Sequence, residues 1–498
     1  MSNEYTLGAV PVGEGEVEFR VWAPRARSVA VRLESGDEPL EPGERWQGRV
    51  AAGPGDDYVF VVDGEELRDP CSRFQPEGVL GPSRVVEVPR GERLGVPLES
   101  LVLYELHVGA FSAEGTFDGA IPHLPRLREL GVTAIELMPV ATFPGDRGWG
   151  YDGVFTSAPH PAYGGPAGLA RLIRAAHDAG LGVILDVVYN HVGPGSELAR
   201  LGPYFTDRHD TFWGDALDYS QRWVREWAIQ NAELWIRDYG VDGLRLDAVH
   251  AVFDDSPTHV LRELRDRVKA IDERALVTAE METGDLRPIE EWGHDAQWAD
   301  ELHHELHVIL TGEREGYYAG YGSVDGLARQ LERQPAERLI VCSQNHDQVG
   351  NRALGDRPAA GELRARAAVV CFAPQTPLLF MGEEYGERAP FRFFTDHVDP
   401  FIADATREGR KREFERFTAF SGEDVPDPQD PRTFEASKLT RQEDAELRAL
   451  YAELLALRRE LPRELTAEVE GRRLRMTRGE VTVEVDFSGP AVEVRHAA

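Results

Sequence analysis

Three carboxylic acids in this 498-residue chain each stand at the end of a short apolar run. Asp247 ends GLRLD, Glu280 ends ALVTAE, and Asp347 follows SQNH. If these runs are neighbouring parallel strands of a barrel, the three side chains meet at one mouth of it. Two carboxyl groups there can cleave a glycosidic bond, since one attacks or stabilises the sugar C1 and the other protonates the leaving oxygen. A third can shape the substrate and keep the first two pKa values apart.

Basic side chains accompany these acids. Arg245 lies two residues before Asp247, so on a strand both side chains share one face, and the guanidinium would keep Asp247 ionised. His191, at the end of DVVYNH, and His346, beside Asp347, are expected to be neutral hydrogen-bond donors to sugar hydroxyls. The residue types therefore predict a site for a neutral carbohydrate.

The segments that would position these residues alternate between apolar runs and helical patterns from Leu101 onward. Repeated β/α units predict a parallel sheet with buried strands, and eight units predict closure into a (β/α)₈ TIM barrel. The predicted strands are 101–111, 132–139, 181–188, 241–249, 275–280, 295–299, 338–344 and 376–382. The predicted helices are near 118–130, 169–176, 220–239, 257–271, 361–373 and 443–460.

Both ends of the chain have the pattern of β structure. Residues 1–92 contain short alternating segments separated by Gly, Pro and Asp, which predicts an N-terminal β-sandwich. Clean alternation at 481–487 predicts a small C-terminal β domain over 463–498. The barrel would then span 93–462 and include an elaborated loop at 387–440, where periodicity is poor. The expected fold class is multidomain, α/β plus β.

Composition narrows the possible partners. The 87 acidic and 55 basic residues give a formal charge of −32, which argues against nucleic acid or a membrane surface as the main partner. Cys71, Cys342 and Cys371 lack a metal-type spacing and are expected to be reduced and buried. The N-terminal residues do not have a signal-peptide pattern, and no run of eighteen apolar residues occurs, so a cytoplasmic protein is expected.

The ordered segments DVVYNH, GLRLDAV, TAE and NHD resemble the four motifs of glycoside hydrolase family 13, the α-amylase superfamily. The resemblance implies Asp247 as nucleophile, Glu280 as general acid/base and Asp347 as transition-state stabiliser, in a mechanism that retains anomeric configuration through a covalent glycosyl-enzyme. It also implies contacts to substrate or nucleophile from Arg245, His191 and His346, with Asp186 as a structural partner.

Longer segments, including ELHVGAFSAEGTFDGAI, QNHDQVGNR and FMGEEYGERAPFRFFTDH, are similar to members of this family that release trehalose. The resemblance implies hydrolysis of the α-1,4 bond next to the terminal trehalose of a trehalose-capped maltooligosaccharide, and a carbohydrate-binding-like N-terminal module. Met281-Glu282 depart from the Asn-Asp pair of that subfamily, which bears on fine specificity near the acid. No cofactor is implied, and the short loop 191–219 has few oxygen ligands for calcium.

Further residues are candidates for sugar contacts, because aromatic faces stack on pyranose rings and carboxylates bind hydroxyls. These candidates are Tyr104, Trp149, Tyr151 and Asp152, which could also be ordinary rim residues. One of Asp300, Glu301 and His304 is expected to meet the trehalose end. The tryptophans Trp213, Trp223, Trp227 and Trp235 are expected to be core or packing residues.

Two other functions remain open. An α-glucan branching transferase would share the sandwich, the barrel and the three acids, and would differ in using a glucan hydroxyl instead of water to resolve the covalent intermediate. A non-catalytic glucan-binding protein would have lost one of the three acids, and none is lost here.

Overall fold

The centre of the computed structural model is a closed barrel of parallel strands in the order β9, β10, β13, β16, β17, β18, β19 and β20. Each strand lies within one of the predicted apolar runs, so the predicted TIM barrel is confirmed. The strands are β9 (Leu103–Leu106), β10 (Ala134–Leu137), β13 (Gly182–Val187), β16 (Gly243–Leu246), β17 (Leu276–Ala279), β18 (Ala296–Trp298), β19 (Leu339–Cys342) and β20 (Thr376–Phe380).

The structure describes residues 5–88, 90–211, 213–414, 425–489 and 491–496. Both predicted terminal β regions and the predicted insertion therefore include residues outside the described ones, namely 1–4, 89, 415–424, 490 and 497–498. Within the described ranges, no helix is long and apolar enough to cross a membrane.

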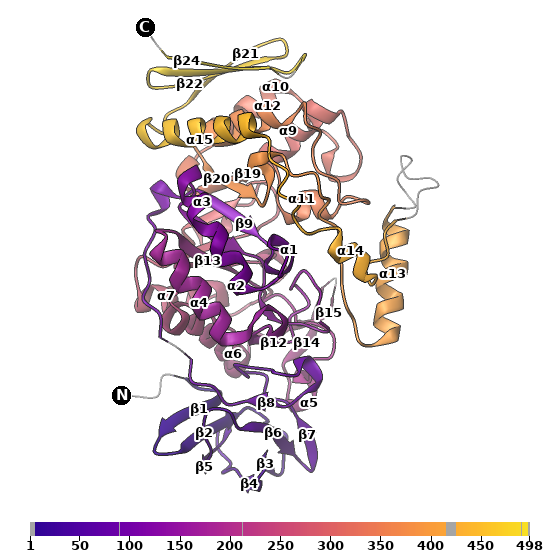
Figure 1. Cartoon of the computed structure of the whole chain (residues 1–498). Coiled ribbons are helices and arrows are strands. Elements are labelled where there is room, and N and C mark those ends of the chain that lie inside the picture. Colours follow the sequence, from indigo (N-terminus) through magenta and orange to yellow (C-terminus); the bar gives the residue numbers. More distant parts are fainter. Residues whose placement is uncertain (1–4, 89, 212, 415–424, 490, 497–498) are drawn as a thin grey trace.

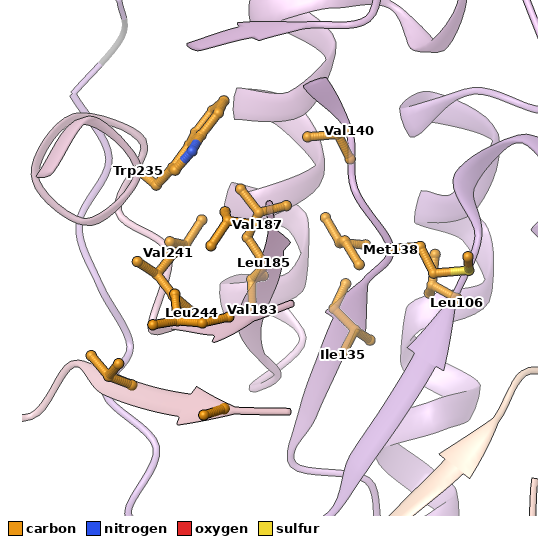
Figure 2. Packing of buried hydrophobic residues seen from close by; sticks show 14 of the residues in the cluster. Leu106, Ile135, Met138, Val140, Val183, Leu185, Val187, Trp235, Val241 and Leu244 are labelled. Atoms are coloured by element: carbon orange, nitrogen blue, oxygen red, sulfur yellow. The ribbon is translucent and has the colours of Figure 1, made fainter. Parts of the chain in front are cut away.

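Side chains alternate between two sides of each barrel strand, and this separates two cores. Inward-facing Leu103, Ala134 and Ile184 belong to a small cluster inside the barrel. Outward-facing side chains belong to the larger cluster beneath the helices. Figure 2 shows part of this outer core, where Ile135 and Leu185 lie near other labelled side chains of the cluster. The alternation also decides which polar residues near the strand ends face the barrel axis.

Helices cover the barrel from outside (Figure 1). The predicted helix at 220–239 is α-helical only as α6 (Arg222–Glu233) and continues as a π-helix, η5 (Leu234–Tyr239), in which the rings of Trp235 and Tyr239 lie 5.0 Å apart. The other helices up to α12 are α1 (Val108–Phe111), α2 (Phe117–Ala120), α3 (Leu124–Leu130), α4 (Gly165–Asp178), α5 (Leu198–Leu201), α7 (Val260–Ile271), α8 (Arg287–Glu290), α9 (Glu301–Thr311), α10 (Val324–Leu331), α11 (His346–Gly350) and α12 (Leu363–Phe372).

β-sheets lie at opposite ends of the molecule (Figure 1). Two N-terminal sheets, ordered β1-β2-β5 and β4-β3-β6-β7 with β8 on β6, meet through Phe19 and Tyr58, whose rings are 5.0 Å apart. Their strands are β1 (Gly8–Gly13), β2 (Glu16–Val21), β3 (Val29–Leu33), β4 (Gly36–Pro39), β5 (Trp46–Ala51), β6 (Asp57–Val62), β7 (Glu65–Leu67) and β8 (Ser83–Arg84). The C-terminal antiparallel sheet consists of β21 (Thr466–Glu470), β22 (Arg473–Arg478), β23 (Val481–Asp486) and β24 (Ala491–His496). After the last barrel strand, α15 (Ala445–Glu460) matches the predicted helix at 443–460.

The predicted loop at 387–440 is more regular than expected. It contains α13 (Pro400–Phe414) and α14 (Pro431–Glu435). Only Ala403, Arg410 and Phe414 of α13 are buried, so the helix has no apolar stripe from which the sequence could have revealed it. The segment 191–219 likewise carries a hairpin of β14 (Phe205–Thr211) and β15 (Gly214–Leu217). A short hairpin between β11 (Ala141–Thr142) and β12 (Phe155–Pro159) follows β10.

Candidate active site

One buried arginine joins three carboxylates of the candidate site. Arg245 Nη1 donates to both Asp186 oxygens at 2.8 and 2.9 Å and to Asp247 Oδ1 at 2.9 Å, while Nη2 donates to Glu280 Oε2 at 2.7 Å. The guanidinium also lies 4.3 Å from the centre of the Trp298 ring. Arg245 and Asp247 therefore share a face, as their spacing predicted, and the two acids on neighbouring strand ends are held by one planar group.

Exposure distinguishes the residues that a substrate could reach from those that support them. The side chains of Arg245 and Asp186 are 0% and 1% exposed, whereas those of Asp247, Glu280 and Asp347 are 10%, 20% and 34% exposed. Asp186 is thus a structural partner of Arg245, as the family resemblance implied. The three acids that were predicted to act on the substrate are the accessible ones.

The backbone after Asp247 orients Glu280. Ala248 has a left-handed conformation with φ 39°, which is rare for a residue with a Cβ atom. In this conformation its N–H donates to Glu280 Oε2 at 2.9 Å. Since Oε2 also accepts from Arg245, it is fixed on two sides.

His191 is linked to Asp247 through Asn190. Asn190 Nδ2 donates to Asp247 Oδ2 at 2.7 Å, and its Oδ1 contacts His191 Nδ1. Burial lowers the pKa of His191 to about 4, so the ring is neutral, as predicted. With Nδ1 as the donor to Asn190, Nε2 becomes a hydrogen-bond acceptor rather than the expected donor. Nε2 is buried and has no hydrogen-bond partner among the described residues.

Trp213 is an exposed aromatic residue beside His191. Its side chain lies on the β14–β15 hairpin, is 47% exposed and stacks on the imidazole, with ring centres 4.0 Å apart and planes 4° apart. Trp213 was predicted to be a core or packing residue; it is not in the core, because the hairpin holds the ring at the surface, where it packs on His191. The other three tryptophans of that prediction are buried.

His346 is charged, in contrast to the neutral donor that was expected. Its Nδ1 contacts Glu105 Oε1 at 2.6 Å, and its Nε2 lies 2.7 Å from the Tyr151 hydroxyl and 3.4 Å from Asp347 Oδ2. Burial alone would lower its pKa, but the charges of Asp347 and Glu105 outweigh burial and raise the pKa to about 10. The imidazolium thus donates from both nitrogens. Tyr151 donates onward to Asp186 Oδ2 at 2.6 Å, and its ring stacks on His346.

Asp300, Glu301 and His304 were the candidates for the contact to the trehalose end. Of these, Asp300 has the strongest electrostatic interaction with the acids of the candidate site. Burial, followed by the charges of Glu280 and Asp347, raises the pKa of Asp300 to about 7. Glu301 is committed elsewhere, because its Oε1 accepts from Gly284 N at 2.8 Å and from Arg333 at 2.6 Å. His304 lies among tyrosines, with its ring 5.0 Å from that of Tyr321 and 5.3 Å from that of Tyr317.

Tyr104 does not reach the candidate site. It is fully buried on the outward side of β9, and its hydroxyl donates to Glu384 and accepts from Gly382 N at 2.9 Å. The alternation along β9 instead turns Glu105, the next residue, toward His346. Tyr104 is therefore a packing residue, which corrects its prediction as a sugar contact.

Trp149 and Asp152 flank Tyr151. Trp149 is mostly buried and stacks on Phe391, and its edge supports His346 at 5.6 Å between ring centres. Asp152 is 36% exposed, and its carboxylate lies 3.8 Å from His397. Asp152 is thus open to a ligand, whereas Trp149 positions the imidazolium.

The sequence did not indicate the roles of Glu105 and Asn190. Each is buried, and each contacts a predicted site residue directly. Asn190 is adjacent to His191 within DVVYNH, which is a usable signal, whereas the pairing of Glu105 with His346 spans 241 residues. Among the described residues, no three His, Cys, Asp or Glu side chains are grouped to hold a metal ion.

The fold and the arrangement of the acids define an α-amylase-type glycoside hydrolase. In agreement, the family described as alpha amylase, catalytic domain, matches residues 83–200. A solved structure from Salmonella typhimurium that is described as an alpha amylase superposes with a TM-score of 0.89 at 38% identity, covering 96% of this chain and 92% of that one.

More specific relatives come from sequence. A malto-oligosyltrehalose trehalohydrolase of Deinococcus radiodurans is 43% identical, covering 92% of this chain and 83% of the relative. One of Saccharolobus solfataricus is 41% identical, covering 90% and 86%. A 1,4-alpha-glucan branching enzyme of Corynebacterium jeikeium is 28% identical and matched over 62% of its length. The chain belongs to the malto-oligosyltrehalose trehalohydrolase family.

Proposed function

We propose that the chain hydrolyses the α-1,4-glucosidic bond next to the terminal trehalose of maltooligosyltrehalose and releases trehalose and a maltooligosaccharide. The names of the relatives support this substrate. The observation that carries the chemistry is the single guanidinium of Arg245, which contacts Asp247 and Glu280 together. A retaining mechanism needs two carboxyl groups about 5–5.5 Å apart, and a shared planar group keeps two carboxylates close.

In the proposed reaction, Asp247 attacks the sugar C1 as the C1–O bond to trehalose breaks. Glu280 transfers its proton to the leaving oxygen, so trehalose departs neutral and a glycosyl ester forms on Asp247. The Glu280 carboxylate then takes a proton from water, whose oxygen attacks C1 and frees Asp247. Arg245 and Asn190 hold the Asp247 carboxylate in place for the attack, since both donate to it.

We assign the remaining side chains to the binding of sugar hydroxyls and faces. Asp347, whose side chain is 34% exposed, would bind hydroxyls of the sugar that reacts, and the buried His346 imidazolium would position it. Trp213, beside His191, offers an exposed ring face for stacking. Asp300, half-buried at the N-terminal end of α9, is the proposed contact to the trehalose end.

Product analysis tests this function. The protein is incubated with maltotriosyltrehalose and, separately, with amylose, and the early products are quantified. Trehalose as the dominant early product, with the new reducing end first in the α-anomeric form, is expected. New α-1,6 branches on amylose without new reducing ends would instead identify the branching transferase, the alternative for which the Corynebacterium relative gives weaker support.

We also propose that the protein is located in the cytoplasm. The three cysteines are buried and unpaired, which is compatible with a reducing compartment such as the cytoplasm. A neutral oligosaccharide, and neither nucleic acid nor a membrane, is the proposed partner, in keeping with the formal charge of −32.

A further inference from the structure

Both oxygens of the Asp347 carboxylate contact side chains from the same short stretch of chain. Asp347 lies in the short helix α11, and Asn351, the residue after this helix, donates from Nδ2 to Asp347 Oδ1 at 2.9 Å. The other oxygen, Oδ2, lies 3.4 Å from His346 Nε2. The orientation of this carboxylate therefore depends on where the C-terminal end of α11 is held.

The end of α11 packs closely against Trp149. Gly350 is the last residue of α11, and a Cβ atom added to it would overlap the Trp149 ring. The indole is itself held by a hydrogen bond of 3.0 Å from its Nε1 to the carbonyl group of Arg392. The backbone at Gly350 therefore cannot move toward Trp149, and contacts elsewhere must keep it from moving away.

Arg410, on α13, binds the backbone on both sides of Asn351. Its Nη2 donates to the carbonyl group of Gly350 at 2.8 Å and to that of Arg352 at 3.2 Å. Carbonyl groups at the C-terminal end of a helix have no donors within the helix, so a basic side chain there is favourable. Asn351, which donates to Asp347, thus lies between two peptide groups that one guanidinium binds.

Burial distinguishes Arg410 from most of α13. It is one of three buried residues among the fifteen of this helix, together with Ala403 and Phe414. The rings of Phe393 and Phe414 lie 5.4 and 4.5 Å from its guanidinium, and Glu413, which pairs with it at 3.0 Å, is exposed. Because burying a guanidinium is costly, a surface helix that needed only solubility would keep its arginines in water. The contacts to α11 give Arg410 a reason to be buried.

We propose that Arg410 is a positioning residue for Asp347. By binding the carbonyl groups of residues 350 and 352, it keeps Asn351 and the end of α11 where Asp347 can act. The segment 387–440, which follows the last barrel strand, thereby influences the reaction through α11. The proposal rests on the proposed role of Asp347, but it does not depend on which glycosidic bond the enzyme cleaves.

Kinetics of the whole protein test the proposal, with Arg410→Met as the main variant and Arg412→Met, at an exposed position of α13, as the matched control. Because Asp347 is proposed to stabilise the transition state, a shift of its carboxylate should lower kcat about tenfold and change KM less than about twofold. Arg412→Met should match the wild type in both constants. The substrates are maltotriosyltrehalose and α-maltosyl fluoride, since the second reports on Asp347 whatever the natural leaving group is.

A double-mutant cycle separates positioning from a general effect on the fold. If Arg410 acts through Asp347, Arg410→Met should cause no further loss of kcat in a protein that already carries Asp347→Asn. An equal loss in both backgrounds would overturn the proposal, and so would wild-type kcat in the folded Arg410→Met variant. Unchanged kcat in Asp347→Asn alone would instead overturn the proposed role of Asp347, and this inference with it.

Arg410→Lys provides a milder variant in case circular dichroism shows that Arg410→Met does not fold. The ammonium group keeps the charge but lacks the planar geometry of the guanidinium, so kcat should fall about threefold. The same double-mutant cycle is then measured with Arg410→Lys. Wild-type kcat in this variant would overturn the proposal in that case.

Discussion

At the scale of single residues, Arg245 determines the electrostatics of the candidate active site. It is fully buried and contacts Asp186, Asp247 and Glu280. The three carboxylates must stay close to the buried guanidinium, because a buried charge without an opposite charge nearby would lower the free energy of unfolding by several kcal/mol. The same contacts fix both oxygens of Asp186, Oδ1 of Asp247 and Oε2 of Glu280. The second oxygen of Asp247 accepts from Asn190.

Glu280→Gln tests the acid/base assignment. The amide keeps the shape of the side chain but cannot transfer a proton, so kcat on maltotriosyltrehalose should fall by about 10²–10⁴-fold. The thermal midpoint should change little. Glu290→Gln, at an exposed position of α8, is the matched control and should retain wild-type kcat. Near wild-type activity in Glu280→Gln would remove Glu280 from the reaction.

His346→Gln tests the charged histidine. The folded pKa of about 10 lies above the ordinary value of 6.5, so the stability from the imidazolium is fully present below pH 6.5 and is lost as pH rises toward 10. Urea unfolding of the wild type should therefore show a loss, on the order of a few kcal/mol, between pH 6.5 and pH 9.5. The free energy of unfolding of His346→Gln should not show this loss between pH 6.5 and pH 9.5.

The exposed His250 provides the control for that measurement. His250→Gln should keep the pH dependence of the wild type. If His346→Gln shows the wild-type slope too, His346 is not a buried cation in the folded protein.

At the scale of elements, the barrel was predictable because buried parallel strands appear as continuous apolar runs. All eight strands lie within predicted runs, and the spacing of Arg245 and Asp247 correctly gave a shared face. The same pattern does not reveal which side of a fully buried strand faces the barrel axis. Tyr104 and Glu105 are both buried. Tyr104 was therefore predicted as a sugar contact, although the side chain that faces the barrel axis is that of Glu105.

Three other features could not be predicted from the sequence, each for a different physical reason. The helix α13 is largely exposed and lacks a periodic apolar face. The charge on His346 depends on Glu105, a contact that only the closed barrel creates. The position of Trp213 depends on the β14–β15 hairpin, whose residues have no clear alternation in the sequence.

Trp213→Ala tests the hairpin as a binding element. Loss of the exposed ring removes the stacking face beside His191, and kcat/KM should fall about tenfold. Trp213→Phe should recover most of the loss. Phe401→Ala, which removes an 82% exposed ring on α13, is the control and should have no effect. Unchanged kcat/KM in Trp213→Ala would exclude sugar stacking at this position.

At the scale of the whole molecule, the N-terminal sheets are joined to the barrel by specific contacts. The Gln230 side chain on α6 accepts from the backbone of Thr6 and Leu7 at 3.2 and 3.0 Å, and the rings of Trp22 and Tyr204 lie 5.0 Å apart. We propose that residues 1–92 and 463–498 are separate domains on a barrel of residues 93–462, and that the first supports α6 and η5.

Gln230→Leu tests this support. The half-buried N–H of Thr6 and the buried N–H of Leu7 would lose their acceptor, and the free energy of unfolding should fall by about 1–3 kcal/mol. Activity should persist at low temperature, since the Gln230 side chain forms its hydrogen bonds with Thr6 and Leu7 and not with residues of the candidate active site. Gln47→Leu, at an exposed position of β5, should leave stability unchanged. Equal stability of the two variants would contradict the proposed support.

Locating the residue that forms the covalent bond to the sugar tests the proposed retaining mechanism most directly. The wild-type protein is treated with a fluorinated α-maltosyl fluoride, in which the ring fluorine slows hydrolysis of the glycosyl-enzyme, and its peptides are analysed by mass spectrometry. We predict one added maltosyl group, located on Asp247. A label on any other residue, or β-anomeric product as the first product of normal turnover, would contradict it.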